Sequence, residues 1–199
     1  MTLKNKEIVI ICVVLVVMVV FCAYILGTKN SRRIAVNFET SMSAETASSD
    51  EEHKYQFLQK PMSDYICSLS DELKIDSDLV VAILMVENPE FNPDAVHKNA
   101  NGTIDCGLFQ LNDRYIWTSF ANAYWFDNIE LDPFNWKHSA FLAIHHLAYL
   151  QSKLKVTDEV ICAYNCGINA VMADKIPDST KSYLKKVKTN LFLLNQQVE

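Results

Sequence analysis

Three features that mark common classes of protein are missing from this sequence of 199 residues. No two cysteines have the two-residue separation of a metal site, and no internal repeat is visible. A surplus of positive charge is missing too: residues 1–54 carry six basic and six acidic side chains, and residues 55–199 carry twelve and eighteen. Nucleic-acid-binding proteins need a basic surface, so this balance argues against a nucleic-acid partner. We also expect no metal and no cofactor.

One segment of the chain is long and apolar enough to cross a membrane. Ile8 to Leu26 is nineteen residues without a charge, glycine or proline, about the length of a helix that spans the hydrocarbon core. No small-residue cleavage site follows, so an uncleaved signal-anchor over residues 1–27 is favoured over a cleaved signal peptide. Basic residues flank the span on both sides, and the positive-inside rule therefore gives no orientation.

The next segment, residues 28–54, is rich in serine, threonine and acidic residues and shows no apolar period. Too few of its side chains can be buried to offset the entropy of ordering, so we expect a flexible linker. Residues 55–199 are long enough to form a single core and make up the predicted domain.

The most informative stretch of this domain is a predicted buried helix. Leu79–Val86 is apolar at every position, Ile75–Asp78 offers side chains that cap a helix, and Pro89 prevents the helix from continuing much further. The helix then ends at Glu87, where apolar surroundings and the negative end of the helix dipole both disfavour a charged carboxyl group. We expect a raised pKa and a side chain that can deliver a proton near neutral pH. The alternative is a glutamate that points into water.

The rest of the domain predicts an α+β fold that is predominantly helical, with a small β or loop excursion. The excursion comprises a turn-rich stretch over residues 92–103, with an Asn-Gly pair that suits a hairpin, and a strand or irregular segment from Ile104 to Asn112. The other expected helices have apolar residues at three- or four-residue spacing. They cover Pro61–Leu73, Asp132-Pro133 to about Leu154, Asp158–Asn165 capped by Thr157, Ile168–Lys175, and a last helix capped by Asp178 or Ser179.

Several groups of side chains are expected to be structural. The aromatic-rich residues 113–126 are assigned to the core in preference to a ligand platform, although sugar-binding clefts also use aromatic faces. His145 and His146 have no partner at metal-ligand spacing. The lysines of the last helix are assigned to its solvated surface; they are Lys181, Lys185, Lys186 and Lys188.

Four separated motifs resemble those of one family, the lytic transglycosylases that share the goose- and hen-type lysozyme fold. Each motif is short, but together they occur in the order and spacing of the family, over roughly Met62 to Val187. They are Glu87 with Phe91-Asn92-Pro93-Asp94-Ala95-Val96, then Gly107-Leu108-Phe109-Gln110, then Ala163-Tyr164-Asn165-Cys166-Gly167, and finally Thr180 with Tyr183.

The resemblance implies a lysozyme-like domain that cleaves peptidoglycan between N-acetylmuramic acid and N-acetylglucosamine. Glu87 would be the single acid and base, first protonating the glycosidic oxygen and then deprotonating the muramyl 6-hydroxyl, which leaves a 1,6-anhydro sugar. By the same resemblance, Tyr183 would donate a hydrogen bond to Glu87. The residues that would line the glycan cleft are Gln110, Asn112, Tyr164 and Asn165.

The sequence departs from the family pattern in two places. The family usually has serine directly after the catalytic glutamate and a shorter connection to the phenylalanine, whereas Asn88-Pro89-Glu90 stands here. This difference concerns the loop geometry, and Asn88 would supply a hydrogen bond to substrate in place of the serine. The acidic residue that usually opens the last motif is replaced by Ser179.

Two alternatives to a transglycosylase stay open. The stretch from Asn101 to Gly107 resembles the hen-type lysozymes equally well, and in those hydrolases the aspartate before this glycine, here Asp105, is a second carboxylate. The same pattern resembles small transglycosylases of secretion and conjugation machines. By this resemblance, such a machine would be a partner of the protein. The other alternative is a catalytically inactive scaffold that binds glycan in a cell-envelope assembly.

Peptidoglycan lies outside the cytoplasmic membrane, so the resemblance implies a single-pass protein with its N-terminus inside and its domain on the periplasmic or extracytoplasmic side. Disulfides are permissible there. The four cysteines of the domain are either free buried thiols or bridged, and a Cys106–Cys166 bridge is one hypothesis; the other two are Cys67 and Cys162.

Overall fold

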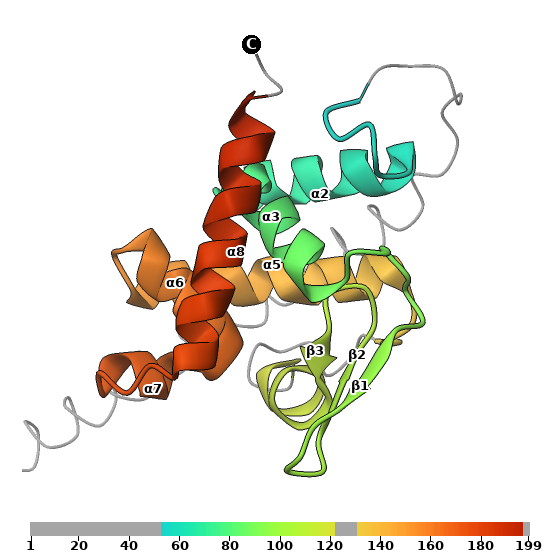
Figure 1. The fold of residues 1–199 in the computed structure, drawn as a ribbon. Helices are drawn as coiled ribbons and strands as arrows, with labels where there is room; N and C mark the ends of the chain where they lie inside the picture. Colours follow the sequence, from blue (N-terminus) through green and yellow to red (C-terminus); the bar gives the residue numbers. More distant parts are fainter. Residues whose placement is uncertain (1–52, 122–130, 197–199) are drawn as a thin grey trace, which may run out of the picture. The chain divides into compact units, whose positions relative to one another are not determined.

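The computed structural model describes residues 53–121 and 131–196, all within one compact unit, Glu45–Glu199. This unit is predominantly helical and contains one small antiparallel sheet (Figure 1), as the sequence predicts. Its elements are α2 (Lys60–Leu73), α3 (Ser77–Glu87), β1 (Val96–Lys98), β2 (Ile104–Cys106), β3 (Leu111–Asn112), η1 (Asp113–Phe120), α5 (Trp136–Lys153), α6 (Thr157–Cys166), α7 (Ile168–Met172) and α8 (Asp178–Asn195).

The predicted signal-anchor and all but the last two residues of the predicted linker lie outside these ranges. Within residues 53–121 and 131–196, no helix has the length and apolar character of a membrane span.

Helix α3 is buried, as its apolar sequence predicts. The Asp76 side chain accepts a hydrogen bond from the Asp78 amide (2.9 Å) and begins the helix, and every residue from Leu79 to Leu84 is at most 4% exposed. The helix ends at Glu87, where the following Asn88 amide still donates to the Leu84 carbonyl (2.9 Å). The position of Glu87 at the end of a buried helix is therefore confirmed.

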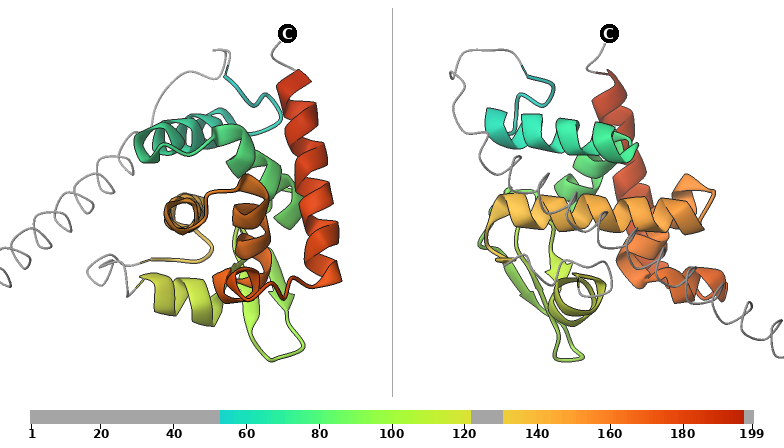
Figure 2. Two further views of the ribbon diagram at one scale, coloured as in Figure 1. Left: turned by 90° about the vertical axis from the view of Figure 1, so that its left-hand side faces the viewer. Right: turned by 180° about the vertical axis from the view of Figure 1, so that it is seen from behind.

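Helix α5 runs through the middle of the helical part (Figure 2), and α2, α6 and η1 all pack against it. Its buried residues from Ala140 to Ile144 are 0–3% exposed. The helix begins three residues later than Asp132-Pro133 suggests, because the Asn135 side chain accepts hydrogen bonds from the amides of Lys137 and His138 and so acts as the cap.

The cap predictions for two other helices are wrong. Thr157 is the first residue of α6 rather than its cap, and α8 begins at Asp178 after Pro177, without a side-chain cap in either case. Both helices instead have acidic residues in the first turn, which interact favourably with the positive end of the helix dipole.

The three strands form one antiparallel sheet in the order β1-β2-β3. The predicted Asn-Gly hairpin joins β1 to β2: the Asn99 amide donates to the Thr103 carbonyl (2.9 Å), and Gly102 has φ +79°. The segment from Ile104 to Asn112, predicted to be a strand or irregular, contains β2, a turn over residues 107–110 and β3. In this register Asp105 lies opposite Asn112, so both side chains reach the same region of the sheet.

The aromatic-rich segment begins as η1, whose backbone has the wide turns of a π-helix. The Ala121 amide donates to the Ile116 carbonyl, five residues back. Phe120 is buried as predicted, but Tyr115 is 61% exposed, so the assignment of the whole segment to the core is wrong. Tyr124, Trp125 and Phe126 lie outside the described residues.

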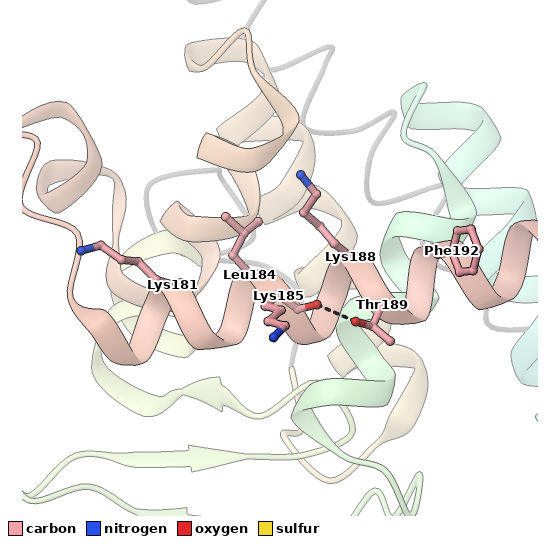
Figure 3. A pocket seen from close by; sticks show the side chains of 6 residues that line it. All are labelled: Lys181, Leu184, Lys185, Lys188, Thr189 and Phe192. Atoms are coloured by element: carbon pink, nitrogen blue, oxygen red, sulfur yellow. Dashed lines mark hydrogen bonds between the residues drawn. The ribbon is translucent and has the colours of Figure 1, made fainter.

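Helix α8 packs along α3 and carries exposed lysines along its length, of which Figure 3 shows Lys181, Lys185 and Lys188. Lys181 pairs with Asp178 one turn earlier (2.8 Å), and Lys188 pairs with Asp158 of α6 (2.9 Å). All four lysines predicted for the solvated surface are exposed.

The four cysteines of the domain are free thiols, and the Cys106–Cys166 bridge is therefore wrong. The two sulfur atoms have different neighbours: Cys106 Sγ lies 3.7 Å from the Leu111 carbonyl on the sheet, and Cys166 Sγ lies 3.9 Å from the Gly167 carbonyl.

Candidate active site

Glu87 borders a cleft and accepts a hydrogen bond from a residue in the last described helix. Tyr183 of α8 donates a hydrogen bond of 2.6 Å to Glu87 Oε1 across 96 residues of sequence. This bond is the one that the family resemblance implies. It forms because α8 packs along α3, which brings a buried tyrosine to the carboxyl end of the buried helix.

The electrostatic environment raises the pKa of Glu87 to about 7. Burial is the main cause, because it removes water from the charged form; the nearby Asp105 carboxylate raises the pKa further. The hydrogen bond from Tyr183 acts in the opposite direction, since it stabilises the carboxylate. The predicted upward shift is confirmed, and the side chain exchanges a proton near neutral pH.

The cleft has a volume of about 1080 Å³ and is bordered by the sheet on one side and by η1, α5 and α6 on the others. Five of the six residues expected at the site line the cleft, and so does Asp105. The sixth, Tyr183, is not among the lining residues and acts through its hydrogen bond to Glu87. The residues that line it are Glu87, Asn99, Asn101, Thr103, Asp105, Gln110, Leu111, Asn112, Tyr115, Ile116, Ser119, Phe120, His146, Tyr149, Ala163, Tyr164, Asn165, Cys166, Gly167, Ile168 and Asn169.

Asp105 is fixed by two amide side chains. Asn99 Nδ2 donates to Oδ2 (2.8 Å) and Asn112 Nδ2 donates to Oδ1 (2.7 Å), so each carboxylate oxygen has one donor. Asn112 also donates to Thr103 Oγ1 (2.9 Å), and its own Oδ1 caps η1 by accepting from two backbone amides. Asn112 therefore holds Asp105 and the start of η1, and it has no N–H left for a ligand.

Gln110 contributes less to ligand binding than its place in the motif implies. Its Nε2 donates to the carbonyls of Ala95 (3.0 Å) and Gly107 (2.9 Å), which ties the turn to the strand region. Its backbone has φ +48°, in the left-handed region. Only the side-chain oxygen of Gln110 remains for a ligand in the cleft.

Tyr164 and Asn165, at the end of α6, also line the cleft. Tyr164 Oη donates to the Phe109 carbonyl (3.3 Å), and burial together with Glu87 raises the pKa of this hydroxyl well above its usual value, so it stays protonated. Asn165 Oδ1 accepts from Thr180 Oγ1 (2.7 Å). The NH₂ group of Asn165 has no partner among the described residues, so it is available to a ligand.

Asn88, expected to contact substrate, does not border the cleft. It is 5% exposed, and its Nδ2 donates to the carbonyls of Asn92 (2.6 Å) and Leu108 (3.2 Å). Its Oδ1 accepts from the Asn92 amide (3.2 Å). The expectation is therefore wrong. Asn88 instead forms hydrogen bonds within the longer connection after Glu87 and to the Gly-Leu-Phe-Gln turn.

Gly107 has a steric reason to be glycine. Its φ is +78°, and a Cβ atom there would lie 2.1 Å from the Pro133 carbonyl oxygen and 3.2 Å from Ser139 Oγ. The first distance is far below van der Waals contact. The absence of a side chain at Gly107 allows the turn to pack closely against the segment that precedes α5.

Sequence reasoning missed several cleft residues, and two sets of them lie on helices. One is the π-helical wall: Tyr115, Ile116, Ser119 and Phe120 recur at the spacing of that wide helix. The other is His146, which was expected to be structural like its neighbour. His145 does pack internally, with Nδ1 2.9 Å from the Phe141 carbonyl, but His146 borders the cleft. The signal for it was Tyr149 three residues later, a second polar ring on the same face of α5.

The described part of the chain contains no group of three side chains that could hold a metal ion.

A mainly helical domain with a small sheet and a protonatable glutamate in the cleft between them has the lysozyme-like fold. The profile of the Transglycosylase SLT domain family matches residues 64–187, and the chain therefore belongs to this family. Among solved structures it is similar to an inactive mutant of the lytic transglycosylase Slt from Pseudomonas aeruginosa, with a TM-score of 0.56 and 15% identity. The match covers 72% of this chain but only 26% of the Slt chain. No curated protein shows significant sequence similarity to the chain.

Proposed function

We propose that this protein is a peptidoglycan lytic transglycosylase that cleaves the β-1,4 bond between N-acetylmuramic acid and N-acetylglucosamine. The observation that carries the proposal is the cleft carboxyl group of Glu87, whose pKa is about 7 and whose position is fixed by Tyr183. One group that must act first as an acid and then as a base needs a pKa near the working pH. Family membership supports the same reaction.

The reaction proceeds in two proton transfers. Glu87 in its protonated form donates its proton to the glycosidic oxygen while the bond from that oxygen to the muramyl anomeric carbon breaks. The resulting carboxylate then takes the proton of the muramyl 6-hydroxyl as its oxygen bonds to the anomeric carbon. The products are a 1,6-anhydro-N-acetylmuramic acid end and an N-acetylglucosamine end whose 4-hydroxyl keeps the first proton. Glu87 is protonated again by the proton of the 6-hydroxyl.

The surrounding residues have separate roles in this proposal. Tyr183 holds the Glu87 carboxyl group in one orientation. The NH₂ group of Asn165, the Gln110 oxygen and the Tyr164 ring contact the glycan, whereas Asn112 acts by holding Asp105.

A muramidase of the lysozyme type is the second candidate, and the geometry of Asp105 favours it. Asp105 borders the same cleft, acts on the pKa of Glu87 and is fixed by two amide donors. A retaining hydrolase needs a second carboxylate to stabilise or attack the anomeric carbon. In that reaction water, rather than the 6-hydroxyl, completes the cleavage.

Mass spectrometry of digested peptidoglycan distinguishes the candidates. Anhydro-muropeptides support the transglycosylase, reducing ends support the muramidase, and release of neither from wild-type protein indicates a glycan-binding scaffold. We expect Glu87→Gln to lower kcat by about 10²–10⁴-fold. Asp105→Asn should retain most of the turnover; a loss as large as that of Glu87→Gln contradicts the single-acid mechanism.

We further propose that the domain acts on the outer side of the cytoplasmic membrane, anchored by residues 8–26. The location of peptidoglycan and the uncharged span support this arrangement. An association with a secretion or conjugation machine is part of the same proposal and rests on the resemblance of residues 101–107. Protease added to spheroplasts should digest residues 55–199 and spare an N-terminal tag.

A further inference from the structure

His146 is a titratable side chain of the cleft that the proposed reaction does not use. It lies on α5 and borders the cleft among three aromatic rings. Its ring centroid lies 4.9 Å from that of Phe120 in an edge-on contact, 5.8 Å from that of Tyr164 and 6.3 Å from that of Tyr149. Burial lowers the pKa of His146 to about 4, so the imidazole is neutral at neutral pH.

The two ring nitrogens of His146 differ in their surroundings. Nδ1 is buried and has no hydrogen-bond partner in the described part of the chain. Because His146 borders the cleft and its other nitrogen is buried, Nε2 is the ring nitrogen left to meet a ligand there. A neutral imidazole carries one N–H group, and a buried N–H without an acceptor is rarer in proteins than an acceptor without a donor. This difference places the hydrogen on Nε2.

The cleft therefore contains an uncharged N–H donor framed by aromatic rings. An uncharged donor suits a neutral carbonyl oxygen, and the rings suit an apolar group beside it. The acetamido group of an amino sugar combines both: a carbonyl oxygen and a methyl group on the same carbon.

We propose that His146 is a specificity-determining residue that binds the acetamido group of an amino sugar, with Nε2–H donating to the carbonyl oxygen and the methyl group packing on the surrounding rings. This inference rests on the proposed function, because it assumes a glycan in the cleft. It adds a reason why the cleft selects N-acetylated sugars over sugars that carry hydroxyl groups alone.

The test measures binding rather than turnover. Full-length Glu87→Gln protein is titrated with two neutral β-1,4-linked tetramers, one of N-acetylglucosamine and one of glucose, by calorimetry or NMR. Adding His146→Phe, which keeps a ring but removes the N–H, should weaken binding of the N-acetylated tetramer about tenfold and leave that of the glucose tetramer unchanged. Adding His146→Gln, which keeps an N–H donor, should restore most of the affinity.

The neighbouring residue provides a matched control. His145 lies on the same helix, but it contacts the Phe141 carbonyl and does not border the cleft, so His145→Gln should bind both tetramers like the parent. Unchanged affinity in His146→Phe, or equal losses for both tetramers, overturns the inference and leaves the proposed function standing. If the Glu87→Gln parent binds neither tetramer, both the inference about His146 and the proposed function are overturned.

Discussion

At the scale of single residues, the ionised carboxyl group of Glu87 lowers the free energy of unfolding. The same surroundings raise its pKa, which the proposed acid and base reaction needs. A protonated glutamate fits its buried position, whereas an ionised one is penalised by lost hydration and by Asp105. Between about pH 4.5, the usual pKa, and about pH 7, the folded protein keeps a proton that the unfolded chain has released. Folding stability therefore falls as the pH rises through this window.

Glu87→Gln should accordingly stabilise the protein at alkaline pH. The amide is neutral throughout and still accepts the Tyr183 hydrogen bond, so the variant avoids a loss of up to about 3 kcal/mol at pH 8. At pH 4 the two proteins should unfold alike. Denaturant unfolding at both pH values measures this difference, and a variant that is equally destabilised at pH 4 and pH 8 contradicts the argument.

Tyr183→Phe should change the pH dependence of activity. The hydroxyl stabilises the Glu87 carboxylate, so its removal should raise the pKa of Glu87 above about 7, by about one unit. The alkaline limb of the kcat/KM profile should move upward with it. Tyr164→Phe is the control, because Tyr164 donates to the Phe109 carbonyl and not to Glu87. A downward shift in Tyr183→Phe, or an equal shift in both variants, refutes this account.

Some properties of the site follow from sequence and others need the folded structure. The raised pKa of Glu87 follows from an apolar helix that ends at Glu87 because Pro89 prevents its continuation, and the family motifs give its hydrogen bond to Tyr183. The roles of Asn88, Gln110 and Asn112 do not follow from sequence. Short amide side chains bond to whichever backbone groups the loops bring near, and loop conformation has no periodic signal.

At the scale of secondary-structure elements, the turn between β2 and β3 connects the sheet to the helices. It is fastened to the end of α3 by Asn88 and to the start of β1 by Gln110. Gly107 seats it against the segment before α5. The turn thereby fixes the sheet, and with it Asp105, relative to the helices.

Gly107→Ala should prevent normal folding, because its Cβ would collide with a backbone oxygen as well as adopt a disfavoured φ. We expect a loss of more than about 4 kcal/mol in the free energy of unfolding. Gly102→Ala is a matched control with nearly the same φ, +79°, and no atom within 4 Å of the added Cβ. It should lose only about 1–2 kcal/mol. Similar stabilities of the two variants would show that Gly107 is not closely packed.

The elements themselves were predictable to different degrees. Helices α2, α3 and α5 have long apolar patterns, and the hairpin has an Asn-Gly pair, so their existence follows from sequence. The caps of α5, α6 and α8 were assigned wrongly because several candidate residues adjoin each start. The π-helical geometry of η1 was not foreseen, since an i→i+5 repeat over two turns is hard to distinguish from an α-helical one.

At the scale of the whole molecule, the domain is held together by packing, with four free thiols among the described residues. Two of these, Cys106 and Cys162, are buried, and burial raises the pKa of both, so they are poorly reactive as thiolates. We therefore expect these four cysteines to make no disulfide contribution to the stability of the described domain.

Reducing agent should therefore leave the protein unaffected. The Tm and the activity of purified protein should be the same with and without dithiothreitol. Alkylation of unreduced, denatured protein should label the peptides that contain Cys67, Cys106, Cys162 and Cys166. A label that appears at any of these positions only after reduction indicates a disulfide and contradicts the structure.

The hydrogen bond between Glu87 and Tyr183 also bears on the order in which the chain emerges during synthesis. Its two partners are 96 residues apart, and the donor lies on α8, the last described helix. A growing chain that has already folded α3 and the sheet still lacks the group that orients its acid. The hydrogen bond to Glu87 is thus completed only when α8 docks against α3, so the C-terminal helix is the last part of the described chain to contribute to the site.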